Sequence, residues 1–502
     1  MSRRRASPPD GEMMRSLAFL LPPLLLAAAP PPAQVAVPGG LIEGVAEGAG
    51  NPLLFRGIPY AAAPIGALRW KAPRPVPRWT GVRAAKARAP ACLQNDYQWN
   101  HADHVRSSED CLTLDIATQT LTGRRPVMVW VHGGSNRAGS AGDTVKAALA
   151  RRGVVLVAIQ YRLGIFGFLS HRALAAEANG TSGNYGLMDQ IAALRWVQDN
   201  IARFGGDPDN VTIFGESAGA QDVGLLLAAP AAAKLFARAI LQSGTPNFGL
   251  PTRPLDRALR IGNQIDALTG SNGNIAPLRA ASAAALLAAD LRLHDESLES
   301  DDFLWLRPTI DGAILPDDPR LLLRDAPVRP VIIGSNRAEF GLPSGRAHRD
   351  ANVDAAFGAN AGKARAFYRL DDPDPAPDPR LGERDLRIAT DIIFRCPAGR
   401  LADLLAEAGW PVWRYEFDLA PDGGRSFHGA DIDYVMDGRS IGPGLSMQDY
   451  WLAFASGGKP APSVGPVWPA YRPGRQHVVF DAHGVTPGAA LAAMPCDWMD
   501  RI

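Results

Sequence analysis

An apolar run that stops at a tight glycine–serine–glycine turn constrains this chain more than any other feature. Residues 211–214 (Val-Thr-Ile-Phe) have the character of a buried strand, and Gly-Glu-Ser-Ala-Gly follows at 215–219. A small-residue and then leucine-rich segment of helical character continues to Ala229. A strand, a sharp turn around a serine and a helix make up a nucleophile elbow, in which glycines remove the Cβ atoms that would collide. We therefore predict that the hydroxyl of Ser217 stands above the edge of a sheet.

The composition is that of an ordinary globular protein and carries no charge bias. The chain has 502 residues, of which 46% are hydrophobic and 21% charged, and its net charge is +1. A nearly neutral chain shows no excess of basic residues that would attract nucleic acids or anionic membranes, so we expect neither as a partner. A chain of this length can bury about three quarters of its unfolded surface, so its core needs no additional cross-links.

The N-terminus has the pattern of a secretory signal peptide. Four arginines within the first 15 residues precede a short apolar run at 17–29, and small residues follow it. Prolines interrupt the run, which is too short to span a bilayer as a helix. We predict a signal peptide over 1–33 with cleavage near Ala33, a secreted or periplasmic mature chain over 34–502, and no integral membrane segment in that chain. A disordered tail is the alternative.

Four cysteines are spread over the chain, and their spacing bears on the compartment. They are Cys92, Cys111, Cys396 and Cys496. None of them forms the Cys-x-x-Cys spacing of a metal or redox pair. An even number in an exported chain suggests two disulfides with three possible connectivities, of which the simplest joins neighbours in the sequence. Buried free thiols are the alternative.

Apolar segments alternate with segments of helical period along most of the chain. Strands are predicted at residues 127–131, 154–159, 211–214, 331–333 and 412–417. Helices are predicted at residues 187–204, 255–268, 278–291 and 398–408, and an exposed loop at 371–379. Continuously apolar strands separated by helices indicate a parallel sheet that is covered on both faces. We predict a single α/β domain with a large, mostly parallel central sheet, flanking helices and loop insertions.

A nucleophilic serine requires several partners. A base must take its proton, an acid must orient that base, and backbone N–H groups must stabilise the oxyanion that forms. In the α/β-hydrolase fold the acid and then the histidine follow the serine in the chain. The donors come from a loop before it, and the predicted strand at 127–131 runs into His-Gly-Gly-Ser-Asn at 132–136, where glycines allow close approach of the backbone.

Five of the nine histidines follow the elbow, and one of them lies where a base is expected. His428 lies in a loop beyond the predicted strand at 412–417. Glu339 directly follows the predicted strand at 331–333 and is the candidate acid. Asp311 is its rival, although the Asp-Gly pair there is more simply a turn.

Further motifs occur in order through the chain, at residues 55–61, 68–70, 108–112, 161–169, 183–190, 200–208, 241–246 and 468–471. With them the chain resembles the type B carboxylesterase family, which includes the cholinesterases and bacterial para-nitrobenzyl esterases. The resemblance extends from about Leu53 to Trp498. It implies an α/β-hydrolase fold and a serine hydrolase that cleaves carboxylic esters through an acyl-enzyme intermediate.

The resemblance also implies roles for individual residues. They are Ser217 as nucleophile, Glu339 as acid, His428 as base, Gly134, Ser135 and Ala218 as oxyanion-hole donors, Glu216 as an electrostatic neighbour of the base, and Ser243 as a hydrogen-bonding support of the triad. The donor loop departs from the family pattern, because Ser135 and Asn136 stand where a third glycine and an aromatic residue are frequent.

Other matching residues are implied to be structural. The resemblance supports disulfides between Cys92 and Cys111 and between Cys396 and Cys496. It also implies ion pairs between Arg69 and Glu109 and between Arg162 and Asp189. Trp99 lies in the first disulfide loop, but it does not align securely with the choline-binding tryptophan of the cholinesterases.

Two other functions are weighed against an esterase. Some proteins with this fold have lost the triad and act as adhesion or binding modules, but here a serine occupies the nucleophile position. A lipase or amidase would use the same residues. His101 and His104 could suggest a metal site, yet an exposed polar loop explains them better. We expect no metal, no cofactor and a small-molecule ester as the substrate.

Overall fold

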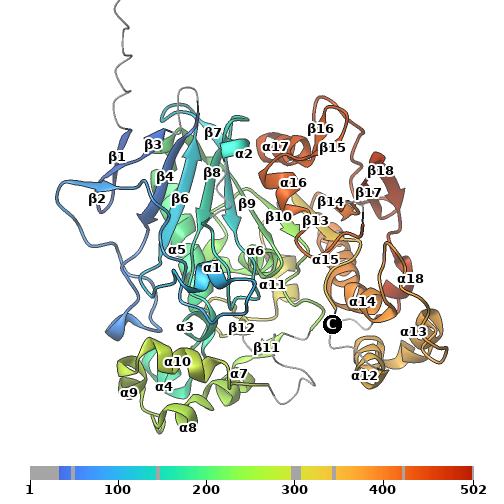
Figure 1. Ribbon diagram of the computed structural model, residues 1–502, viewed down its shortest axis with the longest axis horizontal. Coiled ribbons are helices and arrows are strands. Elements are labelled where there is room, and N and C mark those ends of the chain that lie inside the picture. Colours follow the sequence, from blue (N-terminus) through green and yellow to red (C-terminus); the bar gives the residue numbers. More distant parts are fainter. Residues whose placement is uncertain are drawn as a thin grey trace, which may run out of the picture. The chain divides into compact units, whose positions relative to one another are not determined.

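The computed structural model describes residues 33–46, 51–142, 147–250, 252–295, 307–341, 346–420 and 424–499. The predicted signal peptide, apart from Ala33, lies outside these residues. From Ala33 onward the chain forms one compact unit (Figure 1). In this described part, no helix combines the length and the apolar character that crossing a membrane requires.

The centre of this unit is a large sheet. Within the described residues it has eleven strands, in the order β18-β17-β14-β13-β10-β9-β7-β8-β6-β4-β3. Their bounds are β3 Val45–Ala46, β4 Leu53–Pro59, β6 Thr113–Thr118, β7 Arg125–Val131, β8 Val155–Ile159, β9 Gly206–Glu216, β10 Arg238–Gln242, β13 Val331–Asn336, β14 Val412–Phe417, β17 Gln476–Asp481 and β18 Gly484–Ala489. All strands from β8 to β17 in this order pair in parallel. The pairs outside them are antiparallel. The predicted mostly parallel sheet is thus confirmed, and its antiparallel edges are an addition.

Helices connect these strands, and short strands form three smaller sheets. The helices are α1 His101–His104, α2 Ala147–Ala150, α3 Gly164–Phe168, α4 Arg172–Glu177, α5 Tyr185–Asn200, α6 Ala218–Ala228, α7 Leu255–Gly262, α8 Ile265–Thr269, α9 Ile275–Ala280, α10 Ala283–Asp290, α11 Pro319–Asp325, α12 Arg346–Phe357, α13 Ala361–Tyr368, α14 Arg384–Ala389, α15 Cys396–Glu407, α16 Ile432–Met436, α17 Met447–Gly457 and α18 Ala493–Cys496. Short 3₁₀ turns occur at Gly66–Leu68, Ile201–Phe204, Pro230–Ala232 and Gly358–Asn360, and a π-helix spans Thr390–Arg395. The remaining strands are β1 Gln34–Val37, β2 Gly40–Glu43, β5 Val82–Ala84, β11 Arg253–Pro254, β12 Thr309–Ile310, β15 Ser440–Gly442 and β16 Leu445–Ser446.

The two faces of the sheet carry separate hydrophobic cores, and strand β7 contributes to both. Val127, Val129 and Val131 pack in a cluster with side chains of α5 and α6. Met128 and Trp130 pack in a second cluster with side chains of α16 and α17. Successive side chains of a strand point to opposite faces, so a strand that is covered on both faces must be apolar throughout. This explains the uninterrupted apolar run in the sequence.

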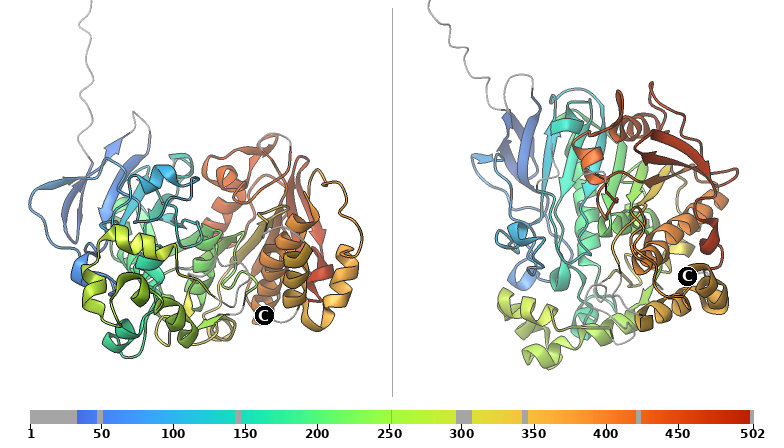
Figure 2. Two further views of the ribbon diagram at one scale, coloured as in Figure 1. Left: turned by 60° about the horizontal axis from the view of Figure 1, so that its bottom comes forward. Right: turned by 45° about the vertical axis from the view of Figure 1, so that its right-hand side comes forward.

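Two predicted helices are each divided in the structure. The segment 255–268 forms α7 and α8, and the segment 278–291 forms parts of α9 and α10. At the second break the Oγ of Ser282 accepts a hydrogen bond from the N–H of Ala285 and so caps the start of α10. A serine cap begins a new helix because it satisfies a backbone donor that the helix itself leaves unpaired. Figure 2 shows α7 to α10 grouped together.

The predicted cross-links and ion pairs are present. Disulfides join Cys92 to Cys111 and Cys396 to Cys496, across Cα–Cα distances of 5.0 and 4.9 Å. Both predicted arginine–carboxylate pairs are bidentate. Arg69 donates to Glu109 over 2.6 and 2.5 Å, and Arg162 donates to Asp189 over two contacts of 2.7 Å.

Candidate active site

The turn around Ser217 is the sharp strand–helix turn that the sequence predicts. Strand β9 ends at Glu216 and α6 begins at Ala218, with Ser217 between them at φ 56° and ψ −125°. This positive φ is costly for a residue with a side chain and is typical of functional turns. A Cβ on Gly219 would lie 2.1 Å from the carbonyl oxygen of Val131, so only glycine fits there. The N–H of Ser217 donates to the carbonyl of Gln242 over 2.9 Å and ties the turn to β10.

Glu339 and His428, which are 89 residues apart in the chain, are hydrogen-bonded to each other. The Nδ1–H of His428 donates to Oε2 of Glu339 over 2.7 Å. The other oxygen, Oε1, accepts from the backbone N–H of Asn336 over 2.7 Å, so both carboxylate oxygens are held. The side chain of Glu339 is fully buried, whereas that of His428 is 20% exposed. The pair therefore has a buried acid and an imidazole that reaches toward solvent.

The second ring nitrogen of His428 faces the residue that precedes Ser217. Its Nε2 lies 3.2 Å from Oε1 of Glu216, as an ion-pair contact without hydrogen-bond geometry. Among the described residues, no hydrogen bond joins Nε2 to the hydroxyl of Ser217. The imidazole is thus placed beside the elbow, with its outer nitrogen free of a hydrogen-bond acceptor.

The two acids and the burial of the site shift the pKa values of Glu216 and His428. Burial opposes the charge of His428, but the negative charges of Glu216 and Glu339 and the hydrogen bond that His428 donates to Glu339 outweigh it and raise the pKa of His428 to about 9. Burial raises the pKa of Glu216 to about 8, although the charge of His428 works in the opposite direction. The pair is electrostatically coupled, so each group favours the charged form of the other.

The His-Gly-Gly-Ser-Asn loop follows β7 and has an unusual backbone. Gly134, Ser135 and Asn136 all have positive φ, at 106°, 58° and 57°. A Cβ on Gly134 would lie 2.1 Å from the carbonyl oxygen of Ala138, so a larger residue cannot replace it. In the part of the chain that the structure describes, the N–H groups of Gly134, Ser135 and Ala218 donate to no protein acceptor. These three donors are available to a ligand.

Aromatic rings surround the candidate base. Phe340 lies edge-on to the imidazole of His428 with ring centres 4.7 Å apart, and Phe394 lies at 5.0 Å. Trp99 is 62% exposed, and its ring would lie 3.2 Å from a Cβ on Gly134. Trp99 therefore stands beside the donor loop, a position that the sequence alone did not establish.

The acid is held by a support that sequence patterns did not indicate. The backbone N–H of Glu339 donates to Oγ1 of Thr390 over 3.2 Å, and that of Ala338 donates to Oγ of Ser426 over 3.2 Å. Asn336 donates through its side chain to the carbonyl of Phe427 over 2.8 Å, which ties the end of β13 to the loop that carries His428. The only hint of this support in the sequence was a polar residue, Asn336, at the end of the strand that precedes Glu339.

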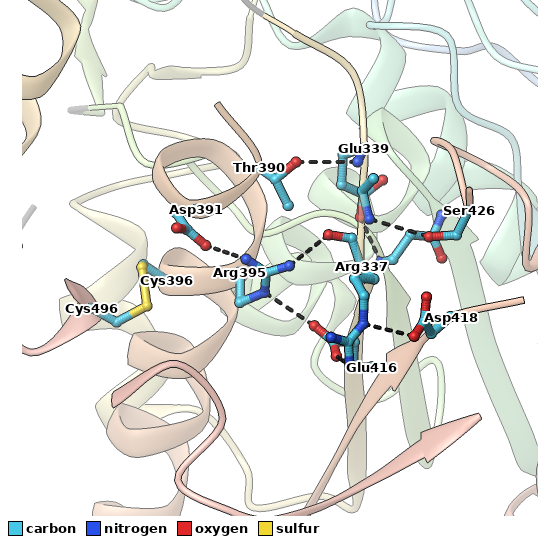
Figure 3. Close-up of polar contacts among 12 residues, drawn as sticks. Arg337, Glu339, Thr390, Asp391, Arg395, Cys396, Glu416, Asp418, Ser426 and Cys496 are labelled. Atoms are coloured by element: carbon cyan, nitrogen blue, oxygen red, sulfur yellow. Dashed lines mark hydrogen bonds and ion pairs between the residues drawn. A yellow bond between two sulfur atoms is a disulfide. The ribbon is translucent and has the colours of Figure 1, made fainter. Parts of the chain in front are cut away.

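An ion network whose carboxylates are buried lies next to this support (Figure 3). Arg395, at the end of the π-helix, pairs with Asp391 and with Glu416, the latter at 3.2 Å. It also donates to the carbonyl of Arg337 over 2.6 Å. Arg337 in turn pairs with Glu416 at 2.6 Å and with Asp418 at 2.8 Å. The network joins the π-helix that carries Thr390 to the loop that carries Glu339, and Cys396 of the second disulfide follows directly.

Other residues that the sequence singled out lie elsewhere or in other roles. Asp311, the rival acid, accepts hydrogen bonds from the N–H groups of Ala313 and Leu315 and closes a turn, as expected of Asp-Gly. The Nδ1 of His101 contacts Asp96 at 2.7 Å on an exposed segment. The Oγ of Ser243 is buried and has no hydrogen-bond partner among the described residues, so its predicted bond to the triad is not formed in this conformation.

The chain is similar to known proteins over most of its length. The model of the carboxylesterase family matches residues 31–486. The chain is 34% identical to fumonisin B1 esterase of Sphingopyxis macrogoltabida over 500 residues, which cover 91% of this chain and 87% of that protein. It is 35% identical to para-nitrobenzyl esterase of Bacillus subtilis over 446 residues, which cover 83% of this chain and 88% of that protein.

A solved structure shows the same fold. A structure titled PNB esterase superposes with a TM-score of 0.79 at 32% sequence identity, over 93% of this chain and 99% of that chain. The strand order of the sheet, the turn around Ser217 and the match to the family model all point to the same fold. The chain therefore belongs to the carboxylesterase family and is a serine hydrolase of carboxylic esters.

Proposed function

We propose that Ser217, His428 and Glu339 are the catalytic triad of this esterase. The observation that carries the proposal is the 2.7 Å hydrogen bond between His428 and Glu339, because the same imidazole lies 3.2 Å from Glu216 and hence beside the elbow. A buried carboxylate on Nδ1 selects the tautomer whose Nε2 accepts a proton and offsets the charge that develops on the ring. Catalytic hydrogen bonds often tighten only when substrate is bound, so the resting contact of Nε2 with Glu216 is compatible with this role.

The reaction proceeds in two halves. The Oγ of Ser217 attacks the ester carbonyl while Nε2 of His428 takes its proton, and a tetrahedral oxyanion forms. The oxyanion collapses as His428 returns the proton to the leaving alcohol, which leaves an acyl-serine. A water molecule then attacks the acyl-serine with His428 again as the base, and the carboxylic acid departs from a restored Ser217.

Backbone donors stabilise the oxyanion in both halves. The N–H groups of Gly134, Ser135 and Ala218 are proposed to point at the developing negative charge. The positive φ of Gly134 and Ser135, the place of Ala218 at the start of α6 and the lack of protein acceptors for all three N–H groups support this assignment. Ser135 in place of a glycine leaves the N–H unchanged. Each donor of this kind contributes on the order of a hundred- to a thousandfold in rate.

Glu216 and Ser243 are proposed to act through the base and not on the substrate. Glu216 sets the pKa of His428 through the charge of its carboxylate, as its 3.2 Å contact supports. Ser243 follows β10 next to the elbow. Its buried Oγ is proposed to hydrogen-bond to the triad when substrate displaces the contact between Nε2 of His428 and Glu216.

The mature enzyme is proposed to be exported, as one domain over residues 34–502 after removal of a signal peptide over 1–33. Two disulfides support an oxidising compartment, because such bonds persist outside the cytosol and are rare within it. N-terminal sequencing of protein recovered from the periplasm or the medium tests this proposal, with a new N-terminus near residue 34 as the expected result. A chain that retains Met1 in the cytoplasm contradicts it.

A fluorophosphonate probe tests the assignment of the nucleophile. One adduct per chain is expected on the peptide that carries Ser217, and hydrolysis of a p-nitrophenyl ester should fall in proportion to labelling. Ser243 lies next to the elbow and is the internal control, because its peptide should stay unmodified. An adduct on any other residue, or full activity after labelling, contradicts the proposal. Comparing the hydrolysis of p-nitrophenyl esters with that of p-nitroanilides of the same acyl groups distinguishes an esterase from an amidase.

A further inference from the structure

A buried polar network holds the loop that carries two of the proposed oxyanion donors. The side chain of Asn136 is at its centre. Its Nδ2–H groups donate to Oδ1 of Asp222 over 3.1 Å and to Oε1 of Gln221 over 3.5 Å. Its Oδ1 lies 3.3 Å from the hydroxyl of Tyr161, whose single proton it shares with the carbonyl oxygen of His132 at 2.7 Å. The amide thus uses both of its donors and its acceptor on protein groups.

The network continues through Asp222 to a second helix. The other carboxylate oxygen of Asp222 accepts from Nε2 of Gln190 on α5 over 2.5 Å. Asp222 lies on α6, one helical turn after Ala218, the first residue of that helix. The bond between Asn136 and Asp222 therefore connects the donor loop directly to the helix that supplies the third donor. Asn136, Asp222 and Gln190 are all buried, with at most 1% of each residue exposed.

The backbone of the loop is fastened at the same places. The carbonyl of Asn136 accepts from the N–H of Gly164 over 2.7 Å, and the carbonyl of His132 accepts from the hydroxyl of Tyr161 over 2.7 Å. Asn136 adopts φ 57°, in the left-handed region that asparagine tolerates better than most residues. The loop is thereby held at Asn136, the last residue with positive φ, and at His132, two residues before the first.

A stabilising role alone does not explain such a network. Burial raises the pKa of Asp222 to about 7, which shows that its charge is costly here. Apolar residues of the same volume stabilise a core as well as a buried polar group does, or better. A buried polar network instead specifies one geometry through the directions of its hydrogen bonds, and here Asn136 and both carboxylate oxygens of Asp222 take part in such bonds. The geometry that this network specifies is the position of the donor loop relative to α6.

We propose that Asn136 and Asp222 are positioning residues that align the N–H groups of Gly134 and Ser135 with that of Ala218. The inference rests on the proposed function, because these three groups must be the oxyanion donors. It assigns no contact with the substrate to either side chain. Their effect is confined to the tetrahedral state, in which the oxyanion requires all three donors at once.

Two single substitutions and their combination test the inference. In Asp222→Asn, an amide replaces the carboxylate that accepts from the amides of Asn136 and Gln190, so one of these two hydrogen bonds is lost. In Asn136→Asp, two carboxylates face each other. We expect either change to lower kcat by about 10- to 100-fold with KM changed less than about threefold, because misplacing a donor loses part of its contribution. The combined N136D/D222N variant again pairs one donor with one acceptor, and kcat should recover at least tenfold over the weaker single variant.

The inhibition constant of a trifluoromethyl ketone distinguishes a positioning role from a purely structural one, because loss of stability alone would leave it unchanged. Its adduct with the serine carries an oxyanion, so its inhibition constant should rise by the same factor as kcat falls. Asp115→Asn is the matched control. Asp115 is a buried carboxylate on β6 that accepts from the N–H of Gly57 over 2.8 Å, so its substitution should lower the melting temperature without changing kcat or the inhibition constant. If a charged variant does not fold, Asn136→Ala replaces it, with the same expected loss.

The outcomes separate this inference from the proposed function. Wild-type kcat and ketone affinity in Asn136→Ala and Asp222→Asn would overturn the inference and leave the triad intact. A fall in kcat without a matching loss of ketone affinity, or no recovery in the combined variant, would also overturn it. Failure of the triad assignment would appear separately, as wild-type enzyme whose fluorophosphonate adduct is not on Ser217.

Discussion

The carboxylate of Glu216 lies 3.2 Å from Nε2 of His428, the ring nitrogen that is proposed to receive the proton of Ser217. The residue beside the proposed nucleophile therefore governs the charge of the proposed base. A protonated imidazole cannot accept another proton, so acylation requires the neutral form. The negative charge of Glu216 favours the protonated form and raises the pKa of His428.

Removing this charge should change the pH dependence of the enzyme. In Glu216→Gln the imidazolium loses a stabilising charge, so the pKa of His428 falls and the neutral base persists to lower pH. We expect the acid limb of the kcat/KM profile to move by about one to two pH units toward lower pH. Glu177→Gln, which alters a partly exposed carboxylate paired with Arg279, should leave the profile in place. A shift toward higher pH contradicts the assigned coupling.

Glu339→Gln should disable the base without unfolding the protein. The amide fits the site of the carboxylate, but it neither selects the required tautomer of His428 nor offsets its charge. A comparable change in a serine protease lowers kcat about 10⁴-fold, and we expect a loss of about 10³- to 10⁴-fold here. Steady-state kinetics with a p-nitrophenyl ester measures this. A loss of less than tenfold would assign the acid elsewhere.

Arg395→Met should destabilise the fold through the network in Figure 3. The substitution leaves Asp391 and Glu416 buried without their shared cation, so the free energy of unfolding should fall by about 3–5 kcal/mol. Arg365→Met is the matched control, because Arg365 pairs with Asp354 on an exposed surface and such pairs contribute about 0–1 kcal/mol. Urea unfolding measures both values. Equal effects of the two substitutions would refute a structural role for the network.

The two disulfides should differ in their effect on stability. In the chain-entropy description, a cross-link stabilises more when it closes a longer loop. The sequence separations are 100 residues for Cys396–Cys496 and 19 for Cys92–Cys111. We expect losses of about 4–5 and about 3 kcal/mol when each pair is replaced by serines. The midpoint of urea unfolding should therefore fall further in the first variant, and the reverse order would contradict the expectation.

The sequence predicted five strands of the sheet, but it missed the central strand β10 and the strands near both edges. The strand expected at 412–417 matches β14, because a strand buried on both faces is apolar throughout and ends abruptly. Strands β4 and β6 were not predicted. Strand β4 contains Gly57 and Pro59, which are unfavourable in strands, and β6 is interrupted by a charged residue, Asp115. Their pairing depends on neighbours that are distant in the sequence.

The same limit applies to the site. Motifs in the sequence indicated Ser217, Glu339 and His428, because each lies directly after a strand or in a loop of recognisable composition. Neither the bond from Asn136 to Asp222, across 86 positions, nor that from Glu339 to Thr390, across 51, has a local pattern. Such contacts arise when the sheet brings separate loops together. The residues proposed to take part in the reaction could therefore be named from the sequence, whereas the contacts that hold them could not.

The most direct test of the triad is the turnover of a p-nitrophenyl ester by Ser217→Ala. We expect kcat/KM to fall on the order of 10⁵- to 10⁶-fold while the melting temperature stays within a few degrees of wild type. A folded Ser217→Ala enzyme with turnover within tenfold of wild type would contradict the assignment.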